Sequence, residues 1–76
     1  MKITTDMQAR KPHPFEDEFT HEWAWTFEDA FNRFAAVSPD VENFKARIMD
    51  AGEEIAAYNP DISAAWARFI VRKATS

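Results

Sequence analysis

The spacing of apolar residues changes its period within residues 17–36. Over residues 17–25, rings alternate with smaller or polar side chains, and the rings belong to Phe19, His21, Trp23 and Trp25. A period of two is typical of a strand, and aromatic and threonine side chains suit a pleated surface. From residue 27 the spacing becomes three and four, which is helical. The pattern predicts a strand over about 17–25 that runs directly into a helix over about 27–36.

The predicted strand has one candidate partner. Residues 2–10 alternate in the same way, and two prolines, Pro12 and Pro14, interrupt regular structure between the two segments. Residues 1–16 are therefore expected to be partly extended, and the two strands would form an N-terminal β-hairpin. Thr26 stands where the following helix needs an N-cap, with Asp29 three positions later. The alternative is one helix from Thr20 to Val37, because Trp23 also fits the helical stripe.

Two further helices begin with the same device. The sequences "SPDV" and "NPDI" start at Ser38 and Asn59, and each offers a capping side chain followed by proline and aspartate. Apolar residues at helical spacing follow both, so we predict helices over about 39–57 and about 60–73.

These elements predict a single domain over residues 1–76. Its fold class is α+β and mostly helical: an N-terminal β-hairpin followed by three packed helices, with an all-α small bundle as the alternative. The core is expected to contain the large apolar residues of the three helices: Phe27, Phe31, Phe34, Phe44, Ile48, Ile55, Trp66 and Phe69.

Composition disfavours several classes of function. The chain has no cysteine and one glycine, which excludes thiolate sites and a glycine-rich phosphate loop. His13 and His21 are eight residues apart, a spacing that matches no metal motif. We expect no enzyme activity, no cofactor and no metal. No signal-peptide pattern or long apolar run occurs, so the sequence predicts a cytoplasmic protein that does not enter a membrane.

Charge is concentrated in the aromatic part of the chain. The net charge is −4, and residues 13–31 carry six carboxylates without any Lys or Arg. An acidic chain lacks the counterion release that drives binding to nucleic acids. The segment is instead predicted to be a docking face, with Trp23 and Trp25 either in it or in the core. The predicted partner-binding residues are Glu16, Asp17, Glu18, Glu22, Trp23, Trp25, Glu28 and Asp29.

The expected function is protein binding without catalysis. We predict an inhibitor or adaptor that docks on a basic surface of a larger bacterial or phage-related protein, and a homodimer through the same face is a further option. One alternative is a small structural subunit of a multiprotein complex. Another is a DNA-binding regulator that uses helix 60–73. A recognition helix usually contacts bases with its N-terminal residues, whereas the basic residues of this helix lie towards its C-terminal end: Arg68, Arg72 and Lys73.

Overall fold

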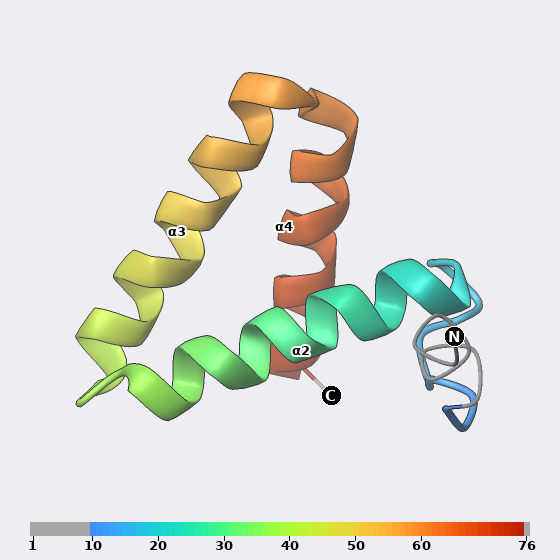
Figure 1. The fold of residues 1–76 in the computed structure, drawn as a ribbon, viewed down its shortest axis with the longest axis horizontal. Helices are drawn as coiled ribbons and strands as arrows, with labels where there is room; N and C mark the ends of the chain where they lie inside the picture. The colour runs from blue at the N-terminus through green and yellow to red at the C-terminus, as the bar shows by residue number, and fades with distance from the viewer. Residues whose placement is uncertain (1–9, 76) are drawn as a thin grey trace, which may run out of the picture.

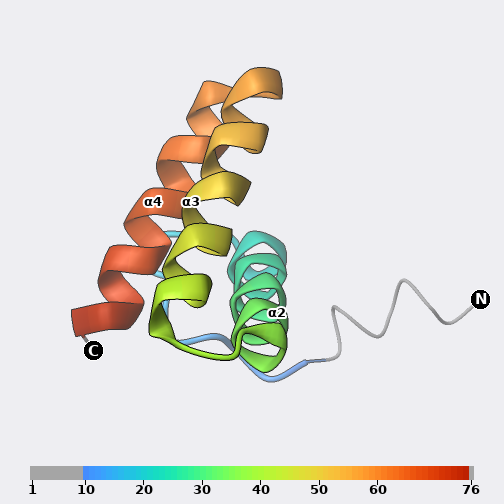
Figure 2. The ribbon, with the colours of Figure 1, turned by 90° about the vertical axis from the view of Figure 1, so that its left-hand side faces the viewer.

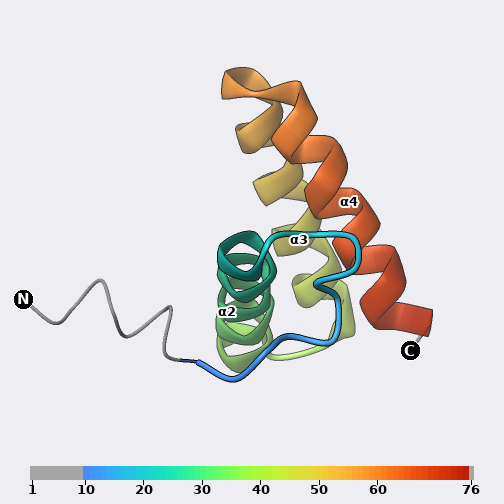
Figure 3. The same cartoon turned by 90° about the vertical axis from the view of Figure 1, so that its right-hand side faces the viewer.

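A computed structural model describes residues 10–75 as three helices: α2 (His21–Val37), α3 (Val41–Tyr58) and α4 (Pro60–Thr75). Helices α3 and α4 form an antiparallel hairpin, and α2 crosses it near the end opposite the α3–α4 turn (Figure 1). Residues 10–20, here called the strap, have no helix or strand. They run beside α2, reach across to α4 and return to the start of α2 (Figure 3).

The predicted β-hairpin is wrong, and the all-α alternative is correct. Residues 10–75 contain no strand, and the segment predicted as one consists of turns followed by the start of α2. The proposed partner strand falls largely on residues 2–9, which lie outside the described residues. Thr20 decides the local structure, because its Oγ1 accepts a hydrogen bond from the Trp23 backbone N–H at 3.1 Å and caps α2. Trp23 and Phe27 then lie on one face of the helix at i, i+4, a spacing that a strand with a period of two satisfies as well.

Helix α2 therefore begins before Thr26, and the predicted cap at Thr26 is also wrong. The α3 cap was misplaced as well: Asp40, not Ser38, accepts from the Asn43 N–H at 2.9 Å. Ser38 instead ends α2, where its hydroxyl donates to the Phe34 carbonyl at 2.6 Å. The backbone N–H of Ser38 also donates to the Ala35 carbonyl, so Ser38 serves α2 as its C-cap and α3 begins at Val41, two residues later than predicted.

The cap predicted at Asn59 is confirmed. Its Oδ1 accepts from the backbone N–H groups of Asp61 and Ile62 at 3.0 and 3.3 Å. The α3–α4 turn is consequently very short and holds the two helices side by side (Figure 2). Where Gly52 of α3 faces α4, a Cβ on Gly52 would lie 3.4 Å from the Trp66 ring, and the Ser63 hydroxyl donates to the Gly52 carbonyl at 2.8 Å.

The core is built around Phe69, which is fully buried. Its ring lies 5.4 to 5.8 Å from three others, those of Phe15, Phe19 and Phe27. Of the predicted core, Phe27, Trp66 and Phe69 are buried, and five residues are only partly buried: Phe31, Phe34, Phe44, Ile48 and Ile55. The sequence interpretation missed the contribution of the strap, which supplies Phe15, Phe19 and the buried His13.

Among residues 10–75, no helix is long and apolar enough to cross a lipid bilayer.

Candidate functional site

Most of the predicted partner-binding residues hold the strap in place. Glu18 accepts from Arg68 Nε and Arg72 Nη1, both at 3.1 Å, and Asp17 pairs with Arg72 at 3.0 Å. The Arg72 guanidinium also lies 4.3 Å from the centre of the Phe15 ring. The basic end of α4, considered above for DNA binding, is thus largely engaged within the molecule.

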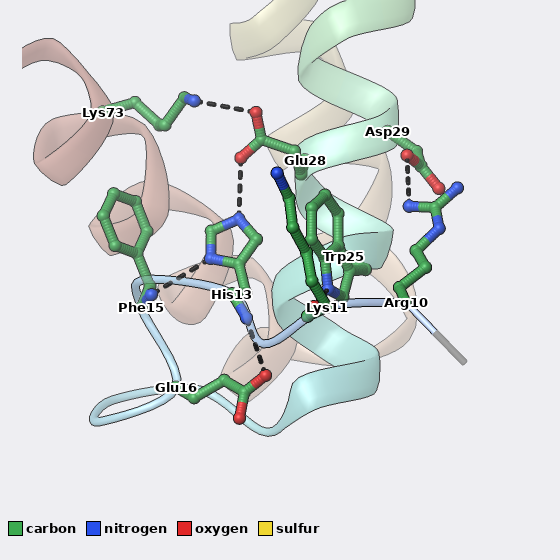
Figure 4. Close-up of polar contacts among 9 residues, drawn as sticks. All are labelled: Arg10, Lys11, His13, Phe15, Glu16, Trp25, Glu28, Asp29 and Lys73. Carbon is green, nitrogen blue, oxygen red and sulfur yellow. Dashed lines mark hydrogen bonds and ion pairs between the residues drawn. The ribbon is translucent and has the colours of Figure 1, made fainter. Parts of the chain in front are cut away.

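A buried network joins the strap to α2 and α4 (Figure 4). His13 Nδ1 accepts from the Phe15 N–H at 3.0 Å, so the neutral ring carries its proton on Nε2 and donates to Glu28 Oε1 at 2.8 Å. Lys73 Nζ donates to the other Glu28 oxygen at 2.8 Å. Burial raises the pKa of Glu28, but the hydrogen bonds from Lys73 and His13 outweigh it, and the pKa lies below its usual value.

Glu16 stabilises the turn of the strap. Its carboxylate accepts from the His13 backbone N–H at 2.8 Å and contacts His21 Nδ1 at 2.5 Å. The hydrogen bond from the His13 backbone, aided by the one from His21, lowers the pKa of Glu16. The Glu16 carboxyl, like that of Glu28, therefore has a lower pKa in the folded protein than an ordinary glutamate side chain.

These two lowered pKa values predict a loss of stability in acid. A carboxyl group with a lowered folded pKa stabilises the protein above its unfolded pKa, and that contribution disappears as the pH falls through the folded value. We expect the free energy of unfolding to be constant near neutral pH and to fall below about pH 4.5. Urea unfolding followed by circular dichroism at pH 7, 5 and 3 measures it, and Glu28→Gln should flatten the decline. A stability that rises on acidification would contradict the network.

Trp25 and Asp29 fasten the other end of the strap. Trp25 Nε1 donates to the Lys11 carbonyl at 3.0 Å, and its ring lies 4.7 Å from that of His13. Arg10 pairs with Asp29 at 2.9 Å and stacks over Trp25. Of the eight predicted partner-binding residues, only Glu22 and Trp23 make no contact that holds the strap.

Trp23 lines an apolar groove between α2 and the α3–α4 hairpin. This groove has a volume of about 430 Å³, and its walls include Phe27 and Ala30 of α2, Ile55 of α3 and Ile62 of α4. Two exposed aromatic residues line it: Trp23 is 41% exposed and Tyr58 is 90% exposed. An adjoining hollow shares Trp23, Phe27 and Ile62 with it and reaches Asp61. Ile55 was predicted as a core residue, and only the crossing of α2 shows that it also lines an open groove.

The groove has few groups capable of acid–base chemistry. Its polar lining side chains are Thr26, Tyr58 and Asn59, and Asn59 Oδ1 already caps α4. Among residues 10–75, no cluster of three His, Cys, Asp or Glu residues could hold a metal ion. The arrangement favours contact with an apolar surface.

No protein family, curated protein or solved structure was found to match this chain.

Proposed function

We propose that this chain is a protein-binding domain without catalytic activity, and that the groove between α2 and the α3–α4 hairpin is its binding surface. The observation that carries the proposal is the exposure of Trp23 and Tyr58 at the mouth of a hollow with apolar walls. Trp and Tyr are the residues most enriched at binding hot spots, and a contiguous apolar patch marks an interface more often than a solvated surface.

The groove is a better candidate than the acidic strap. Glu16, Glu18 and Glu28 are engaged with His21, Arg68 and Lys73, so a partner would have to break internal contacts to use them. Trp23 and Tyr58 need no such rearrangement, because their rings are already accessible. The groove, rather than the acidic strap, is therefore the proposed binding surface.

The finer part of the proposal concerns the biological role. An inhibitor or adaptor that docks on a basic surface of a larger bacterial or phage-related protein suits a chain of 76 residues with a net charge of −4. Both the small size and the negative charge support association by electrostatic steering.

The proposal predicts that the double variant Trp23→Ala/Tyr58→Ala loses its partner. A hot-spot truncation typically costs about 2 kcal/mol or more, so one such residue accounts for a fall in affinity of at least about thirtyfold and two account for about 700-fold. Tagged proteins would capture partners from the source cell, with quantification by mass spectrometry. Circular dichroism would verify that the variant remains folded.

A matched control exists on another face. Met49 and Val71 are 65% and 64% exposed and line a separate hollow between α3 and α4. The variant Met49→Ala/Val71→Ala truncates two exposed apolar side chains of that other hollow and should capture the same partner as the wild type. Equal capture by the groove variant and the wild type would overturn the proposal.

A further inference from the structure

We infer that the groove receives an amphipathic α-helix of another protein, with Lys or Arg beside its apolar face. The inference rests on the proposed function and specifies the partner's chemistry. Its starting point is the arrangement of the three helices, because the α3–α4 turn projects beyond α2 in both views (Figures 1 and 3). Ile55, Tyr58 and Ile62 lie close to this turn and line the groove.

The walls of the groove select a helix over an extended segment. All three walls are helices, whose backbone groups are bonded within each helix, and residues 10–75 offer no free strand edge. An extended peptide would therefore turn its N–H and C=O groups toward an apolar wall, at a cost of roughly 1–3 kcal/mol for each group left without a partner. A helix satisfies its own backbone and can insert apolar side chains at i, i+4 and i+7.

Three carboxylates near the groove favour a partner with a positively charged binding face. Glu22 lies one turn before Thr26 on α2, Glu54 lies one turn before Tyr58 on α3, and Asp61 lines the adjoining hollow. None of these three carboxylates forms an ion pair within residues 10–75.

The helix termini only partly offset these charges. The N-terminal ends of α2 and α4 each contribute about +0.5 charge. The C-terminal end of α3 meets α4 at the same turn and contributes about −0.5 charge. Arg68 lines the adjoining hollow as well, but it is paired with Glu18. The charge beside the groove therefore remains negative, which favours a basic flank on the incoming helix.

The same charges oppose a second copy of this chain. A two-fold dimer brings the same patch of both copies together, so the carboxylates of Glu22, Glu54 and Asp61 from both copies would gather in one interface. A different chain with Lys or Arg beside the apolar stripe avoids that repulsion and gains complementary charge.

The test is a selection from a displayed library of 18-residue helical peptides. Apolar positions at i, i+4, i+7 and i+11 vary among Leu, Ile, Phe, Met and Trp, and the flanking positions vary among Lys, Glu, Gln and Ser. The purified full chain is the bait, and Met49→Ala/Val71→Ala serves as the matched control bait. We expect enriched peptides to carry Lys at the flanks and to lose at least tenfold in affinity for Trp23→Ala/Tyr58→Ala.

Two measurements on an enriched synthetic peptide complete the test. Replacing a central residue by proline should abolish binding, because it breaks the helix. Reversing Glu22, Glu54 and Asp61 to Lys should weaken binding at least tenfold and reduce its dependence on salt. Enrichment of Glu-flanked peptides, tolerance of the proline or absence of any groove-dependent peptide would overturn the inference. If the groove variant still loses its cellular partner in that case, the proposed function stands and only the helical, basic partner is refuted.

Discussion

Phe69→Ala is expected to remove a large share of the protein's stability, about 3–5 kcal/mol. Phe69 is fully buried at the point where the strap, α2 and α4 meet, and its ring packs against those of Phe15, Phe19 and Phe27. Truncating a buried Phe to Ala costs about 3–5 kcal/mol. At roughly 0.05–0.15 kcal/mol per residue, a chain of 76 residues has a total stability of about 4–11 kcal/mol.

Guanidinium unfolding of the wild type and of Phe69→Ala measures this loss. The matched control is Val71→Ala, two positions along the same helix and 64% exposed, which should change stability by less than about 1 kcal/mol. A loss below about 1.5 kcal/mol for Phe69→Ala would show that the strap does not close the core as described.

The second large effect is expected for Glu28→Ala. This substitution removes the carboxylate that accepts hydrogen bonds from His13 Nε2–H and from Lys73 Nζ. The His13 side chain is only 3% exposed, so water cannot readily replace the lost acceptor. A buried donor left without an acceptor costs about 1–3 kcal/mol. The expected destabilisation is therefore about 2–3 kcal/mol, with the strap detaching from α2 and α4 before the helices unfold.

Asp29→Ala is the matched control for this prediction. Asp29 occupies the next position of α2 and pairs with Arg10, but both side chains are about 40% exposed. An exposed ion pair contributes roughly 0–1 kcal/mol, so the control should lose little. Hydrogen exchange of the Phe15 and Phe19 amides would report strap release directly. Similar stability losses for the two variants would contradict the special role of the buried network.

The helices were predictable where the signals are local. Asn59 followed by proline and aspartate identifies the start of α4, since a cap and a proline at the first helical position act through their own backbone. The apolar stripes of α3 and α4 likewise follow from helical spacing alone. The error at residues 17–25 arose because Trp23 and Phe27 satisfy both periods, and the capping bond of Thr20 decides between them.

The candidate site was harder to predict. The acidic residues were identified as an interface from their density in the sequence, yet Glu18 and Glu28 pair with residues 45 to 54 positions away. Such pairs exist only once the strap and α2 lie against α4, so no local pattern reveals them. Tyr58 is 90% exposed and lines the groove, which exists only because α2 packs across the hairpin.

The sequence by itself predicted helices over about 39–57 and 60–73, and the structure has them at 41–58 and 60–75. These predictions were close because capping and apolar periodicity act over a single turn. The sequence also determined the acidic net charge and the absence of thiol chemistry. The tertiary structure alone decided that the strap completes the core and that a groove remains beside Trp23. It also decided that the strap carboxylates pair with His21, Arg68 and Arg72 within the molecule. Those outcomes depend on contacts between residues far apart in the chain, and their geometry exists only after the helices pack.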